Sequence, residues 1–225
     1  MVHVKRKVPG PAPDVVKRLA TFTAATVYEA SGRNGYVDCR IKPLAPGMKI
    51  AGVALTVQCH PRDNLMLHKA LQIAEPGDVI VADVGDYREA GYWGGLMTDS
   101  ALARQLGGLA IDGCIRDGAE IVEKGFAAFC RGLCMRGTVK AVLGRVNHQI
   151  IFGGALVNPG DFVLGDDDGI VIIPRERIDE VLEASQRRVD AEERKSAALS
   201  SGTSSVELNK LDQKFESLGL VEDEP

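Results

Sequence analysis

The residues of this chain best suited to chemistry lie between Gly94 and Glu120. The run Gly94-Gly95-Leu96-Met97 precedes an expected helix at 98–106, and Arg116-Asp117 follows a short buried strand that begins at Leu109. A helix N-terminus offers backbone N–H groups to an anion, arginine adds a fork for a carboxylate, and aspartate is an oxygen ligand for a hard cation. The stretch therefore predicts a metal-assisted site for a small carboxylic acid.

Strands and helices alternate through the middle of the chain, and this pattern would bring such residues to one edge of a sheet. Apolar and β-branched residues predict strands, and helical spacing with capping residues such as Thr23 and Asp63 predicts helices. The expected strands are 48–58, 79–82, 127–130, 139–146, 150–151, 162–164 and 170–173, and the expected helices are 14–19, 21–30, 63–74 and 120–124. The fold class is therefore α/β.

The C-terminal part of the sequence differs from the rest in pattern. Residues 175–199 predict a long helix with one apolar face and many charges on the other. Residues 207–220 could form a further helix inside a Ser- and Gly-containing, then acidic, tail. With no linker before this point, we expect one domain over 1–200 and a tail over 201–225.

Composition narrows the class of partner. The 225 residues include 27 Lys and Arg against 31 Asp and Glu, a formal net charge of -4, which provides no general attraction to nucleic acid. No apolar run is long enough to cross a bilayer, and the N-terminus does not resemble a signal peptide. We expect a cytoplasmic protein with a small-molecule ligand and neither a nucleic-acid nor a membrane partner.

Two other motifs suggest metal binding but favour simpler explanations. Cys130 and Cys134 lack a second Cys/His pair at a zinc spacing, so the five cysteines are expected to be reduced and mostly buried. The run 166–168 has three aspartates but no distal glutamate, so a hairpin turn is favoured over a calcium loop. We also find no glycine-rich nucleotide loop of the kind a methyltransferase would need.

The Arg-Asp pair stands at a defined spacing from other residues of this stretch. Twenty residues separate Gly95 from Arg116, Asp117 follows, and Glu120 stands one helical turn on. Further ordered motifs are Thr26-Val27-Tyr28-Glu29-Ala30, Pro76-Gly77-Asp78-Val79, Gly137-Thr138-Val139-Lys140, Val157-Asn158-Pro159-Gly160-Asp161 and Asp166-Asp167-Asp168-Gly169.

Together these motifs resemble the family of class II 4-hydroxy-4-methyl-2-oxoglutarate and 4-carboxy-4-hydroxy-2-oxoadipate aldolases. The family also contains the ribonuclease E activity regulator A. The resemblance covers most of residues 14–200 and implies a swivelling β/β/α-type α/β domain with a long C-terminal helix. It also implies a homotrimer or homohexamer with its sites at subunit interfaces.

The resemblance further implies roles for single residues. Asp117 would ligate a Mg²⁺ or Mn²⁺ ion directly, and Glu192 of a neighbouring subunit would hold the ion's water. Arg116 would bind the 2-oxo acid and stabilise the enolate, and backbone amides of Gly94, Gly95, Leu96 and Met97 would receive the substrate carboxylate.

The activity implied is a divalent-metal-dependent lyase. It would cleave 4-hydroxy-2-oxo dicarboxylic acids by retro-aldol reaction to pyruvate and a second oxo acid, and it would decarboxylate oxaloacetate through the same pyruvate enolate. The alternative is a non-catalytic regulator that binds a ribonuclease or another protein, but such regulators lack the aspartate at 117. Several of the aldolases carry an acidic residue where this chain has Gly95, and Asp99 and Asp86 are the candidates to replace it.

Overall fold

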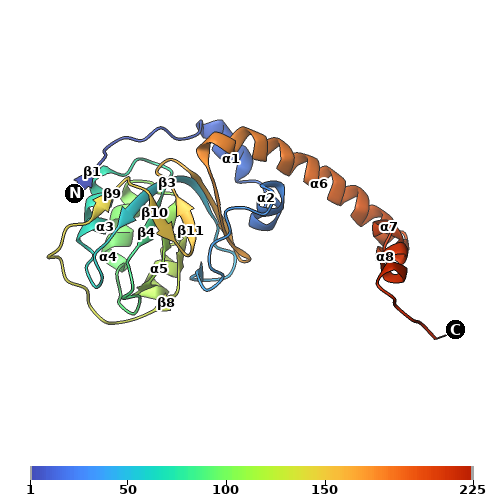
Figure 1. The fold of residues 1–225 in the computed structure, drawn as a ribbon. Helices are drawn as coiled ribbons and strands as arrows, with labels where there is room; N and C mark the ends of the chain where they lie inside the picture. Colours follow the sequence, from blue (N-terminus) through green and yellow to red (C-terminus); the bar gives the residue numbers. More distant parts are fainter. Residues whose placement is uncertain (1, 224–225) are drawn as a thin grey trace. The chain divides into compact units, whose positions relative to one another are not determined.

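The computed structural model describes residues 2–223 and divides the chain into two compact units, Met1–Ser185 and Gln186–Pro225. The first unit is mixed α/β, which confirms the fold class (Figure 1). Among the described residues, no helix is both long and apolar enough to cross a membrane.

The first unit is built on a sheet whose described strands number nine (Figure 1). Strands β3, β4, β5 and β7 run parallel at its centre, whereas β12 and β9 pair with β3, β2 pairs with β7, and β13 pairs with β12, all antiparallel. The bounds are β1 His3–Val4, β2 Lys42–Pro43, β3 Ile50–Gln58, β4 Asp78–Asp83, β5 Gly108–Ile111, β7 Ala128–Cys130, β9 Arg145–Val146, β12 Phe162–Asp166 and β13 Gly169–Ile173.

Both faces of the central strands are covered, which explains why these strands are continuously apolar. Alternate residues such as Ile80 and Leu109 pack on one face with Leu67 and Met97, whereas Val79 and its equivalents pack on the other. The first face carries α3 (Leu65–Ile73), α4 (Gly95–Ala103) and α5 (Gly118–Glu123). The second carries the hairpin of β10 (Ile150–Phe152) and β11 (Ala155–Val157).

The remaining elements of the first unit are short. Helix α1 spans Pro13–Leu19 and α2 spans Ala24–Ala30, where the hydroxyl of Thr23 accepts the Thr26 N–H at 3.1 Å and confirms the predicted cap. A separate two-stranded parallel sheet joins β6 (Cys114–Ile115) to β8 (Gly132–Leu133). Strand β6 leads directly into the Arg-Asp pair.

The sequence predictions hold for most elements but fail at some boundaries. The helix predicted at 98–106 lies three residues earlier, at Gly95–Ala103, because Gly94 directly before it is an extended N-cap and Gln105 just beyond it has a left-handed φ of 57°. Residues 139–144 are irregular where a strand was predicted, and their N–H groups at 141 and 142 instead donate to Asp63 at 2.6 and 2.8 Å. That carboxylate also accepts the Leu65 N–H, so it serves two segments at once.

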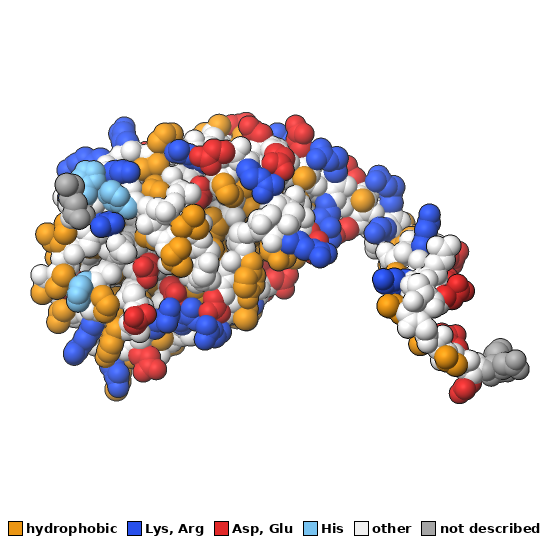
Figure 2. All heavy atoms as spheres, viewed as in Figure 1, with side chains coloured by type: hydrophobic (Ala, Val, Ile, Leu, Met, Phe, Trp, Pro, Cys, Tyr) orange, Lys and Arg blue, Asp and Glu red, His pale blue; other side chains and the backbone are white. Residues whose placement is uncertain are grey.

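The long C-terminal helix is confirmed as α6, Ile178–Ser200, preceded by a 3₁₀ turn at Arg175–Arg177. The second unit then has two short helices, α7 (Ser205–Asn209) and α8 (Asp212–Ser217), rather than one over 207–220. They are separated at Lys210, which adopts a left-handed conformation with φ 53°. On the visible face, acidic and basic side chains are interspersed over both units (Figure 2).

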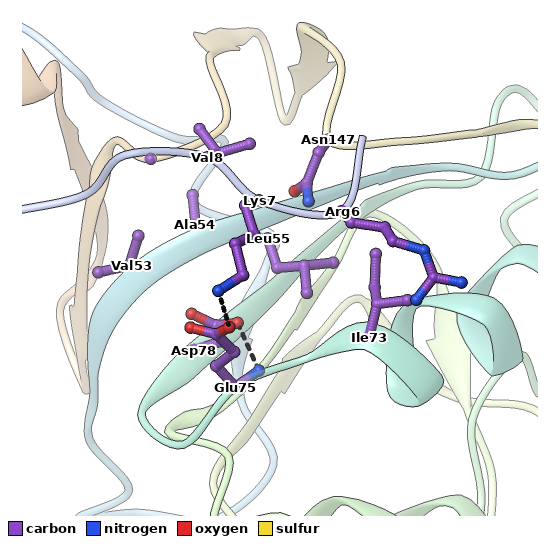
Figure 3. A pocket seen from close by; sticks show the side chains of 11 residues that line it. Arg6, Lys7, Val8, Val53, Ala54, Leu55, Ile73, Glu75, Asp78 and Asn147 are labelled. Carbon is purple, nitrogen blue, oxygen red and sulfur yellow. Dashed lines mark hydrogen bonds and ion pairs between the residues drawn. The ribbon is translucent and has the colours of Figure 1, made fainter. Parts of the chain in front are cut away.

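The N-terminal segment of the first unit crosses the edge of the sheet. Strand β1 pairs with β9, and the Asn147 side chain donates to the carbonyl of Lys5 at 2.8 Å. Behind this segment lies a small cavity of about 110 Å³ where Lys7 approaches Glu75 at 3.9 Å (Figure 3). Burial raises the pKa of the Asp78 carboxyl at its base.

We expect Phe129→Ala to lower the free energy of unfolding by about 3–5 kcal/mol, the usual cost of removing a buried phenyl ring. Phe129 is fully buried at the centre of β7 and packs on the second face of the sheet, the face that carries Val79 and the β10–β11 hairpin. Urea unfolding would measure the loss, with the half-exposed Ile151→Ala as the control that should stay within about 0.5 kcal/mol of the parent. Equal unfolding midpoints for the two variants would contradict this packing.

Candidate functional site

The candidate site forms where the N-termini of α4 and α5 meet. Gly94 is the extended N-cap of α4, and Asp117 is the N-cap of α5. The Asp117 carboxylate makes no capping bond to its own helix; its Oδ2 accepts the N–H of Gly95, the first residue of α4, at 3.0 Å. One carboxylate therefore joins the two helix starts.

The backbone at Asp117 is unusual. Its φ of 58° and ψ of 36° place it in the left-handed region, which aspartate tolerates better than most residues but which still carries a cost. Such conformations persist where the surroundings enforce them and cluster at functional sites. Here the conformation directs the carboxylate to α4.

Arg116 is held beside this carboxylate by its main chain. Its N–H donates to the Trp93 carbonyl at 2.9 Å, and its Nε lies 3.7 Å from Asp117 Oδ2, with about half of each side chain exposed. A Cβ built at Gly94 would lie 2.5 Å from that oxygen and 3.2 Å from Arg116 Nε. Only glycine lets the turn approach the Arg-Asp pair so closely.

An ion cluster around the buried Asp112 supports the strand that delivers Arg116. Asp112, just before β6, pairs with Arg88 at 3.0 Å and with Arg131, which in turn pairs with Asp38 at 3.0 Å. The main chains of the same two arginines bond β6 and its approach, since Cys114 N–H donates to the Arg88 carbonyl and Arg131 N–H to that of Gly113. Side chains and main chain thus restrain the segment together.

Glu120 occupies the space that a side chain at residue 95 would need. A Cβ built at Gly95 would overlap the Glu120 carboxylate. Lys124 contacts this carboxylate and that of Asp99, both at 2.6 Å, and these bonds raise the pKa of the lysine, with Asp99 contributing most. Asp99 and Asp86 are not among the described residues that line the cleft, so Glu120 is the carboxylate that stands beside Gly95.

The indole of Trp93 fixes the turn from behind. Its Nε1–H donates to the Thr98 hydroxyl at 2.9 Å, and that hydroxyl donates to the Gly94 carbonyl at 3.2 Å. The ring also stacks on Phe126, with centroids 5.9 Å apart. Trp93 is the single tryptophan of the chain, so its fluorescence would report on this site.

These groups open onto a cleft of about 430 Å³. Its other wall comes from α3 and from the segment after β8, which contribute His68, Thr138 and Lys140. Burial, and then the Lys140 charge, lower the pKa of His68. The cleft thus has carboxylates and an arginine on one wall and basic groups on the other.

The backbone donors at the start of α4 are not equivalent. The N–H of Gly95 is used by Asp117, and the N–H of Met97 donates to the Gly94 carbonyl at 3.1 Å. The N–H of Leu96 has no hydrogen-bond partner among the described residues. An incoming carboxylate would find that amide open and would compete with Asp117 for the amide of Gly95.

The donor set fits a hard divalent cation. No group of three or more His, Cys, Asp and Glu side chains gathers within the described part of the chain. Asp117 and Glu120 nevertheless supply two carboxylates on one wall, and Mg²⁺ is commonly held by one or two carboxylates plus water and substrate oxygens. These residues could hold such an ion.

Sequence reasoning identified only part of this cleft. Gly94 to Met97, Arg116 and Asp117 come together as its lining, whereas Glu120 was noted for its spacing but given no role. The signal available for Glu120 is its position one turn after Asp117, and for Lys140 it is the Gly137–Lys140 motif, which carried no role. His68 gives no signal, because its partners across the cleft are far away in sequence. Glu192 lies on α6 beside Arg188 at 2.8 Å, and its role in a neighbouring subunit stays a prediction.

The chain is similar to several known proteins. A protein of Halalkalibacterium halodurans named "Putative 4-hydroxy-4-methyl-2-oxoglutarate aldolase" is 31% identical over 194 residues, covering 86% of this chain and 92% of that protein. The crystal structure of Streptomyces coelicolor RraAS2, described as an unusual member of the RNase ES inhibitor RraA family, superposes with a TM-score of 0.78. It is 25% identical, and the match covers 84% of this chain and 99% of that one.

A second solved structure shares the fold. It is described as S-adenosylmethionine: 2-dimethylmenaquinone methyltransferase from Geobacillus kaustophilus, with a TM-score of 0.62 and 28% identity over 68% of this chain and 93% of that one. The family model for RraA-like proteins, Aldolase/RraA, matches residues 24–172. That span includes the whole Gly94–Glu120 site, and the chain belongs to the RraA-like Aldolase/RraA family.

Proposed function

We propose that this protein is a divalent-metal-dependent lyase that cleaves 4-hydroxy-2-oxo dicarboxylic acids to pyruvate and a second oxo acid. The observation that carries the proposal is the convergence of Asp117, Glu120 and Arg116 on the N-terminus of α4. An RraA-like relative that bears an aldolase name supports it.

Asp117 and Glu120 would hold Mg²⁺ or Mn²⁺, with Glu192 of a neighbouring subunit as a further, water-mediated contact. When bound, such an ion supplies Lewis acidity at the 2-oxo group of the substrate. The left-handed backbone of Asp117 and the missing side chain at Gly95 together determine where the carboxylates of Asp117 and Glu120 lie.

Arg116 would bind the 2-oxo oxygen and stabilise the negative charge that develops there as the C–C bond breaks. A guanidinium stays protonated, so it provides a permanent positive partner for the enolate. The Leu96 amide would receive the substrate carboxylate at the positive end of α4. These two contacts orient the bond to be broken.

A retro-aldol reaction also requires removal of the 4-hydroxyl proton. The Glu120 carboxylate lines the cleft, where Lys124 pairs with it at 2.6 Å, and it could accept that proton through one water. Oxaloacetate decarboxylation reaches the same pyruvate enolate without such a base. One site could therefore perform both reactions.

The second substrate carboxylate would meet the opposite wall. Lys140 makes no ion pair with any other described residue, and His68 lies beside it. An uncompensated positive charge across the cleft from Arg116 suits a dianionic substrate. This arrangement favours dicarboxylic over monocarboxylic 4-hydroxy-2-oxo acids.

We expect Asp117→Asn to reduce Mg²⁺- or Mn²⁺-dependent pyruvate release from 4-hydroxy-4-methyl-2-oxoglutarate and oxaloacetate to background. The neutral amide can still accept the Gly95 N–H, so the fold should be retained, but it is a far weaker ligand for a hard cation. A pyruvate assay with circular dichroism as the folding control measures this. Unchanged activity would sink the proposal, and an inactive parent that forms a stable complex with a ribonuclease would favour the regulator alternative.

We expect Glu120→Gln to weaken Mn²⁺ binding or activity by about 10–100-fold, the usual effect of removing a carboxylate that supports a metal site. Asp99→Asn is the matched control, because Asp99 contacts the same Lys124 without lining the cleft. Calorimetric titration with Mn²⁺ measures both.

A swap tests the geometric explanation for Gly95. In Glu120→Ala the space beside residue 95 becomes free, so adding Gly95→Asp should recover a large part of the lost Mn²⁺ affinity. If the double variant binds no better than Glu120→Ala, a carboxylate in that space does not serve the ion.

A further inference from the structure

A groove between α3 and α4 continues from the cleft. It has a volume of about 260 Å³ and shares His68, Leu96 and Met97 with the cleft lining. The other residues that line it are Leu71, Gln72, Ser100 and Arg104. A ligand anchored at the start of α4 could extend into it without crossing a barrier of main chain.

The groove walls are one face of each helix. Leu96, Ser100 and Arg104 follow one another at helical spacing along α4. His68 and Gln72 have the same spacing on α3. The apolar part lies near the cleft and the charged group lies at the far end.

The guanidinium of Arg104 is not paired with any other described side chain. It is exposed at the C-cap of α4 and makes no side-chain hydrogen bond or ion pair with any described residue. Among the described residues that line the groove, none is acidic. Its ordinary role would be a solvated side chain near the negative end of the helix, but the groove gives it a ligand-facing position.

The distance suits a small elongated acid. From Leu96 to Arg104 the helix rises about 12 Å. Side chains on a helix lean towards its N-terminus, and Arg104 lines the same groove as Ser100 and Leu96. An arginine side chain extended in that direction would span part of this rise, leaving room for a short acid between the guanidinium and the Leu96 amide.

We propose that this groove binds the distal chain of 2-oxo dicarboxylic acids longer than a 2-oxoglutarate, and that Arg104, in place of Lys140, binds the terminal carboxylate of these longer acids. This inference rests on the proposed function, since that function places the 2-oxo acid end in the cleft. The apolar surface of Leu96 and Met97 contacts the methylene chain, and the charge at Arg104 selects an acid over a neutral end. Arg104 thereby determines substrate length and charge.

The test compares 2-oxoadipate with 2-oxohexanoate, which have the same carbon chain and differ in the terminal carboxylate. Neither has the 4-hydroxyl, so binding is measured without turnover, by calorimetry and Trp93 fluorescence in the presence of Mn²⁺. We expect the parent to bind 2-oxoadipate roughly 10-fold tighter, and Arg104→Gln to remove most of that preference while leaving 2-oxohexanoate unaffected.

Two controls make the result specific. Arg104→Lys keeps the charge and should keep a clear preference, and Arg18→Gln, at an exposed arginine in the last turn of α1, should change nothing. Equal affinity of the parent for both acids, or an unchanged preference in Arg104→Gln, overturns the groove proposal alone. If neither acid binds and 4-hydroxy-2-oxo acids release no pyruvate, the proposed function fails together with it.

Discussion

The hydrogen bond from Gly95 N–H to the Asp117 carboxylate is the contact on which the site depends. It ties the start of α4 to the start of α5, although 22 positions separate the two residues. This hydrogen bond requires a left-handed backbone at Asp117 and the absence of a side chain at Gly94. The Arg116 N–H beside it donates to the Trp93 carbonyl. Each adjustment carries a cost or restricts the sequence, and together they leave a carboxylate, a guanidinium and a helix N-terminus facing one space.

The sheet makes this contact possible. Parallel strands β4 and β5 end at the same edge, so the loops that follow them emerge side by side. The two arginines paired with the buried Asp112 then hold the approach to β6 in place. Removing one partner from such a cluster would leave an uncompensated buried charge, which is why charged groups of this kind act as restraints.

The position of the Glu120 carboxylate explains the glycine at position 95. A missing side chain on α4 first suggests a missing acidic group, but the same absence makes room for a carboxylate that reaches across from α5. The two positions are complementary, since a side chain at 95 and the observed place of Glu120 exclude each other. The acidity of this corner is therefore a property of the helix pair and not of one residue.

Local periodicity, capping and short spacing were enough to predict the α/β class, most strands and helices, the Thr23 cap, the long C-terminal helix and the candidate Arg-Asp pair. Tertiary structure decided what such patterns do not contain. The irregular path of 139–144 follows from a distant carboxylate at Asp63, and the basic wall of the cleft follows from the packing of α3 beside that segment. The place of Glu120 and the groove that ends at Arg104 likewise depend on how α4 lies between α3 and α5, which is set by packing on the sheet and not by any spacing along the chain.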